Sequence, residues 1–188
     1  MQIDAFLPKY DFTEIHKVTV KASPQKTLAA VKDLLPSELS PLVFWMLAAR
    51  SLPARLMGQR TPGTGDDERP FLAQLYTGGF IPLEESDQEV VFGLVGQFWK
   101  LVGEEHVEID GPQAFLDFER TDFAKVAANL AVQPAGEGTL LSTETRIAAP
   151  DEQTRRKFAF YWRLISFGSG WIRVMWLRAI KRKAEARK

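Results

Sequence analysis

The stretch GTLLSTETRIAAP, residues 138–150, and the long aromatic segment that follows it decide the fold. Leu141 and Ile147 alternate with Glu144 and Arg146, and this period of two predicts a half-buried strand over residues 139–148. Asp151 directly follows a proline and is a typical helix N-cap. Beyond it, apolar and small residues recur at steps of three and four, which predicts one long terminal helix. The positions on this stripe are Phe158, Tyr161, Ile165, Gly168, Ile172, Met175 and Ala179.

Upstream of this stretch the chain reads as one more strand, short helices and an antiparallel meander. Residues 14–22 alternate, with His16 and Val18 on the inward face, and two or three short helices follow within residues 24–57. Residues 58–67 read as a polar loop. Further strands are predicted at 71–76, 79–83, 89–95, 105–109, 114–119 and 123–133.

We therefore predict an α+β fold, in which a curved antiparallel sheet of about seven strands wraps the terminal helix. A sheet of this kind needs one face covered, and only the terminal helix is long enough to cover it. The 188 residues are predicted to form a single domain with a core of about residues 12–186.

Composition excludes several classes of protein. Without cysteine the chain has no disulfides, thiolate zinc sites or iron–sulfur clusters, and two histidines are too few for a histidine-rich metal site. Lys and Arg total 24 and Asp and Glu also total 24, which argues against a nucleic-acid partner. No signal peptide and no membrane-spanning run is seen, so we expect a cytoplasmic protein without stable membrane insertion.

The order of elements, with residues 138–150 leading directly into the helix at Asp151, resembles the helix-grip superfamily. This superfamily includes START-type, birch-pollen-allergen-like and polyketide-cyclase-like proteins, and the resemblance, which is to bacterial members, covers the chain from about Phe12. It implies an apolar cavity between sheet and helix. Members bind lipids, sterols or polyketides, and some catalyse cyclisation or dehydration. They share no catalytic motif, so no catalytic residue is carried over.

The first functional hypothesis is that a hydrophobic or amphipathic small molecule, lipid-like or polyketide-like, binds in that cavity without a metal or cofactor. The small residues at 166–170 either leave volume for this ligand or allow the sheet to approach closely. The cavity candidates are the inward-facing positions of the first strand, of strand 123–133 and of the terminal helix: His16, Val18, Val126, Leu130, Tyr161, Ile165, Gly168 and Ile172.

The second hypothesis is a cyclase- or dehydratase-type enzyme that uses His16 or the Glu144–Arg146 pair as acid and base. His16 is either such a group or a hydrogen-bonded core residue. Glu144 and Arg146 either orient a polar ligand head or form a solvent-facing ion pair, and the more apolar opposite face of their strand favours the ion pair. His106 stands among glutamates, where a solvated acidic strand is favoured over a metal site.

The third hypothesis is an interaction or membrane-surface role for the basic end of the chain, where residues 171–188 hold seven bases and one acid. A solvated helix end is the plainer interpretation. We expect only weak, salt-sensitive membrane association, because the sheet should cover the apolar face of this helix. The aromatic residues all round the helix predict either a cavity wall or packing against residues 40–57 or a second copy of the chain, as in a homodimer.

Overall fold

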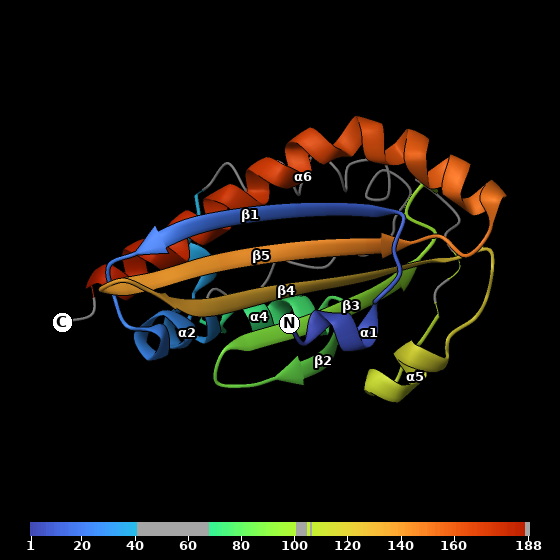
Figure 1. The fold of residues 1–188 in the computed structure, drawn as a ribbon. Coiled ribbons are helices and arrows are strands. Elements are labelled where there is room, and N and C mark those ends of the chain that lie inside the picture. Colours follow the sequence, from blue (N-terminus) through green and yellow to red (C-terminus); the bar gives the residue numbers. More distant parts are fainter. Residues whose placement is uncertain (41–67, 101–104, 106, 187–188) are drawn as a thin grey trace.

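The computed structural model describes residues 1–40, 68–100, 105 and 107–186. Five strands form one antiparallel sheet in the order β1-β5-β4-β3-β2 (Figure 1). The strands are β1 (Phe12–Val20), β2 (Ile81–Glu85), β3 (Glu89–Gly96), β4 (Ala124–Ala135) and β5 (Gly138–Ala148).

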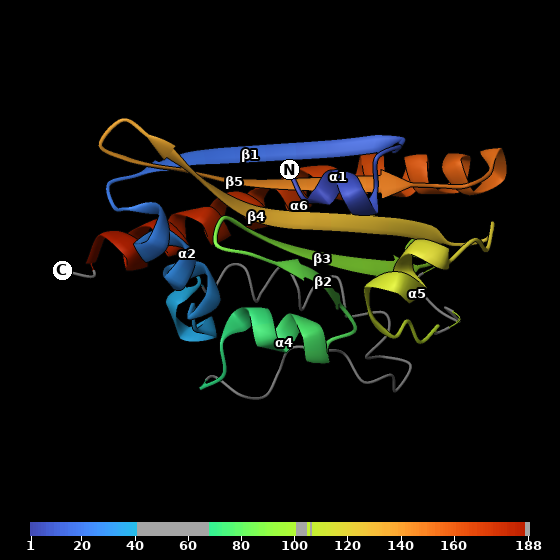
Figure 2. The same ribbon diagram turned by 60° about the horizontal axis from the view of Figure 1, so that its bottom comes forward.

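The terminal helix α6 (Glu152–Ala186) lies along one face of this sheet. The shorter helices are α1 (Ile3–Phe6), α2 (Pro24–Lys32), the 3₁₀ turn η1 (Pro36–Glu38), α4 (Phe71–Thr77) and α5 (Gly111–Asp117) (Figure 2). Helices α2 and α4 pack with α6 on the same face of the sheet, whereas α1 and α5 pack on the opposite face. Ser23 caps α2. As the sequence predicts, α6 begins just after Asp151, whose side chain accepts from the backbone amide of Thr154. The predicted α+β class and helix-sheet arrangement are confirmed.

The predicted count of about seven strands is wrong, because two of the short segments are helices. The segments predicted at 71–76 and 114–119 form α4 and α5. In α4, Leu72 and Leu75 belong to the same apolar cluster at helical spacing, and α5 has a proline in its first turn. Periodicity alone does not separate helix from strand in runs this short. At 105–109, the described residues are not in a strand.

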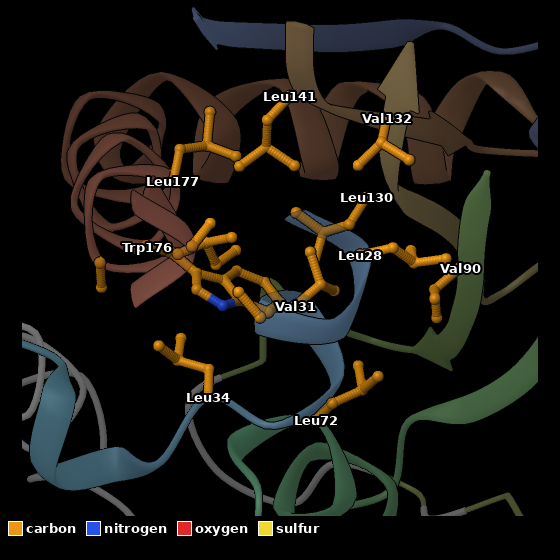
Figure 3. Close-up of a cluster of buried hydrophobic side chains, with 14 of the residues drawn as sticks. Leu28, Val31, Leu34, Leu72, Val90, Leu130, Val132, Leu141, Trp176 and Leu177 are labelled. Carbon is orange, nitrogen blue, oxygen red and sulfur yellow. The ribbon is translucent and has the colours of Figure 1, made fainter. Parts of the chain in front are cut away.

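Two separate apolar clusters attach α6 to the sheet. The proximal cluster, near the start of α6, contains Phe158 and Tyr161 packed on Ala124 and Ile147. The distal cluster, near its end, joins the sheet to α2, α4 and α6 (Figure 3). Its labelled members in Figure 3 are Leu28, Val31, Leu34, Leu72, Val90, Leu130, Val132, Leu141, Trp176 and Leu177. The helix is therefore packed against the sheet near both ends. The stretch of α6 between the two clusters belongs to neither of them.

Candidate functional site

Polar side chains of β1 and β5 lie between the two clusters, under the middle of α6. Glu14 and His16 on β1 pair in register with Thr145 and Thr143 on β5. Cross-strand partners point to the same face, so these four residues form one patch, which we call the polar belt. Its neighbours on that face are Phe12 and Ile147 on the proximal side and Val18 and Leu141 on the distal side.

Helix α6 completes the belt with Ser169 and Arg173. Nη1 of Arg173 donates to Oε2 of Glu14 at 3.0 Å and to Oγ of Ser169 at 2.7 Å. The other carboxylate oxygen of Glu14 lies 2.8 Å from Nε2 of His16. Burial lowers the pKa of the Arg173 guanidinium, and the Glu14 carboxylate opposes that shift. Glu14 thus connects a half-buried imidazole to a half-buried guanidinium.

At Gly170, helix α6 lies directly against the side chains of Glu14 and His16 on β1. A Cβ at this position would collide with Oε1 of Glu14 and lie 3.3 Å from Nε2 of His16. Any side chain at this position would therefore have to displace the Glu14 carboxylate. Gly168, half a turn earlier, is only partly buried.

One hydroxyl of the belt has no partner among the residues that the structure describes. Oγ1 of Thr143 donates to the backbone oxygen of Asn129 at 2.7 Å. Oγ1 of Thr145, whose residue is only 2% exposed, makes no hydrogen bond. A buried hydroxyl without a partner is costly, so this atom is a candidate contact for a bound molecule.

The predicted cavity residues lie on both sides of the belt. Val18 and Leu130 belong to the distal cluster, and Val126, Tyr161 and Ile165 belong to the proximal cluster. His16 is in the belt itself. Gly168 and Ile172 belong to neither cluster and are partly exposed, although they continue the helix face that Tyr161 begins and Trp176 ends.

Glu144 and Arg146 lie on the opposite face of the sheet, away from α6. They face outward as the ion-pair interpretation expects, but they are not solvated: their side chains are 7% and 8% exposed, and Nε of Arg146 donates to Glu144 at 2.7 Å. Arg146 also binds the carbonyl of Leu7 and the carboxylate of Asp4. The N-terminal segment covers this pair, which therefore anchors that segment and does not line the space under α6.

Two questions remain: whether side chains are arranged to hold a metal ion, and whether a helix could cross a membrane. His106 lies outside the described residues. Within the part of the chain that the structure describes, no group of three His, Cys, Asp or Glu side chains is arranged to hold a metal ion. Over the same residues, no helix has the length and apolarity to cross a bilayer.

No protein-family model and no curated protein matches this sequence. Solved structures do match. Protein MLL2253 from Mesorhizobium loti is 10% identical over 94% of this chain and 99% of its own, with a TM-score of 0.41. TTHA0849 from Thermus thermophilus is 9% identical over 93% and 98%, with a TM-score of 0.37. CalU16 from Micromonospora echinospora is 14% identical over 93% and 84%, with a TM-score of 0.25.

The chain has a helix-grip fold. The antiparallel sheet, the helices after the first strand and the long terminal helix along one sheet face are the features that the sequence resemblance implies. Likeness at these identities says nothing about a ligand or a reaction.

Sequence reasoning assigned no polar role in the site to five members of the belt: Glu14, Thr143, Thr145, Ser169 and Arg173. Glu14 carried a usable signal, because it stands two residues before His16 on the same strand face. Thr145 carried none, since its missing partner is visible only in three dimensions. The contact between Glu14 and Arg173 spans 159 residues of sequence, and no local pattern predicts it.

Proposed function

We propose that this protein binds an amphipathic, oxygen-bearing small molecule, lipid-like or polyketide-like, between the sheet and the middle of α6. The observation that carries this proposal is the unpartnered Thr145 hydroxyl, buried beneath a part of the helix that is itself incompletely buried. The two apolar clusters offer surfaces for the apolar body of the molecule on either side of the belt.

The chemistry of the belt supports an oxygen-bearing group at its centre. The hydrogen bonds described for Arg173 use Nη1 alone, which leaves Nε and Nη2 able to donate. Thr145 can donate or accept. A carbonyl, hydroxyl or carboxylate oxygen would satisfy both groups, whereas a purely hydrocarbon molecule would leave them unsatisfied.

The test compares Thr145→Val with Thr143→Val. Both changes replace a belt hydroxyl by a methyl group of similar shape, but only the Thr143 hydroxyl already has a protein partner. We expect Thr145→Val to weaken binding of the fluorescent fatty acid cis-parinaric acid by about two- to tenfold, the usual net worth of one hydrogen bond. Thr143→Val should leave the affinity nearly unchanged. The proposal fails if the wild-type protein shows no saturable binding, or if the two variants bind equally.

Gly168→Leu tests where the molecule lies. The leucine side chain would add bulk at a partly exposed position in the middle of α6. We therefore expect loss of parinaric acid binding with little change in melting temperature. If the position is tightly packed instead, the added bulk should destabilise the fold by about 1–3 kcal/mol. A large fall in melting temperature with unchanged binding would contradict the proposed location.

A second candidate function is acid–base catalysis on the bound molecule, because Glu14 is placed to orient the His16 imidazole. The buried Glu144–Arg146 pair does not support it, since it lies on the other sheet face. With an aromatic polyketide precursor as substrate, this alternative requires that His16→Gln abolish turnover while parinaric acid binding persists. Binding without catalysis requires no effect of His16→Gln beyond a modest change in affinity.

A further inference from the structure

The outer face of α6 carries a stripe of exposed apolar side chains. Phe160, Leu164, Phe167 and Trp171 are 71%, 69%, 86% and 49% exposed. They follow one another at steps of four, three and four, so they lie on a single helix face. The sequence predicts that the aromatic residues of this helix line a cavity or pack against residues 40–57 or a second copy of the chain, and residues 41–57 lie outside the described part. Within the described part of the chain these four side chains are exposed, and we call them the outer stripe.

This clustering is not the ordinary scatter of apolar residues on a protein surface. Eight large apolar side chains of the described residues are exposed, and four of them fall in these twelve consecutive positions of one helix. A contiguous exposed apolar patch with a polar border is the usual mark of an interaction surface.

Cationic side chains continue the outer stripe at both ends. Lys157 precedes Phe160 by three residues, while Arg178 and Arg182 follow Trp171 by seven and eleven, which keeps all three on the same face. All three are exposed, although Arg182 also donates to the Glu38 carbonyl. The helix's acids, Glu152 and Glu185, each form ion pairs with bases of the same helix.

A second copy of the chain or an anionic lipid surface could cover the outer stripe, and the cations at its ends distinguish between the two. If two copies paired through it in antiparallel fashion, Lys157 of one would face Arg178 or Arg182 of the other; in parallel fashion, like residues would meet. Both arrangements place cations against cations. An anionic lipid surface instead accepts cations at the level of its headgroups and aromatic side chains at the acyl boundary.

We propose that α6 docks this protein lengthwise on an anionic membrane surface, with Phe160, Leu164, Phe167 and Trp171 in the interface and Lys157, Arg178 and Arg182 on the headgroups. The helix does not cross the bilayer. Docking of this kind uses the helix face that points away from the polar belt, so it stands independently of the proposed ligand site.

Flotation tests this proposal with two kinds of vesicle, phosphatidylcholine alone and phosphatidylcholine mixed with phosphatidylglycerol in about equal amounts. The test variant is Leu164→Gln with Phe167→Gln, because glutamine keeps the helix propensity of an exposed site. Ile15→Thr is the matched control, since it removes an exposed apolar side chain from β1 instead. Circular dichroism confirms that each variant is folded.

We expect the wild-type protein and Ile15→Thr to float only with the anionic vesicles. The double variant should partition at least about tenfold less, and raising the salt concentration should weaken binding by screening the cations. The proposal is overturned if the wild-type protein does not float, if neutral vesicles bind it equally, or if the double variant binds as well as the wild type. A dimer in sedimentation velocity that the double variant abolishes would also overturn it and assign the outer stripe to a second copy.

Discussion

At the scale of single residues, Gly170 sets how closely helix and strand approach. A leucine there would strike Glu14 and press on His16, so we expect Gly170→Leu to lower the free energy of unfolding by about 1–3 kcal/mol. Gly170→Ala should fall within about 1 kcal/mol of wild type, because the gain in helix propensity offsets displacement of the flexible Glu14 side chain. Urea unfolding measures both. A neutral Gly170→Leu would mean that the helix does not contact β1 here.

The unpartnered Thr145 hydroxyl also predicts a stability effect in the absence of ligand. Thr145→Val removes a buried polar atom that has no partner, so it should raise the free energy of unfolding by about 1 kcal/mol. Thr143→Val breaks a buried hydrogen bond and should lower it by about the same amount. Opposite signs in urea unfolding support the assignment, and a destabilising Thr145→Val would show that this hydroxyl has a partner.

At the scale of elements, the buried Arg146 is one of the groups that anchor the N-terminal segment. Arg146→Met would leave Glu144 buried without its counter-charge and remove the bond to Leu7, so we expect a loss of about 3 kcal/mol. Arg156→Met is the control: its side chain is 79% exposed, and the change should cost less than about 0.5 kcal/mol. Limited proteolysis should also cut Arg146→Met first within its opening residues. Equal stability of the two variants would refute the anchor.

Helix α6 covers the inner face of the sheet and contributes to both apolar clusters. No other helix of the described residues contributes to both. A chain ending at Pro150 would expose Leu130, Leu141 and Ile147, which are at most 1% exposed in the complete fold. We expect this truncation to be insoluble or to unfold without a cooperative transition. A soluble truncation with a sharp urea transition would refute the dependence of the sheet on α6.

For the molecule as a whole, three carboxylates with lowered pKa values predict loss of stability in acid. The backbone amide of Thr154 lowers the pKa of Asp151, and hydrogen bonds from Arg120 lower the pKa values of Glu105 and Asp122. Carboxylates with folded-state pKa values below their unfolded values stabilise the fold above the unfolded values, here 3.8 for Asp and 4.5 for Glu. That contribution is lost as the pH falls through the lower folded values.

The melting temperature should therefore begin to fall below about pH 4.5. Asp151→Asn should make this fall shallower, because asparagine caps the helix without titrating. Thermal unfolding followed across this pH range checks both statements, and an unchanged pH profile for Asp151→Asn would remove Asp151 from the explanation.

The sequence alone determined the long elements. Strand β5, helix α6 and the inward face of β1 were all predicted, because a period of two or of 3.6 that persists over many residues has a single structural solution. The same local reasoning failed for α4 and α5, where seven residues fit either period and packing against neighbouring elements decides.

Tertiary structure alone decided the site. It placed Glu144 and Arg146 under the N-terminal segment, and it joined Glu14 to Arg173 across 159 residues of sequence. Among the described residues, it also leaves Oγ1 of Thr145 without a hydrogen-bond partner and the outer stripe exposed. Periodicity reports which side chains share a face of one element, but burial and hydrogen bonding depend on which other elements reach that face, and those contacts are set by the packing of the whole chain.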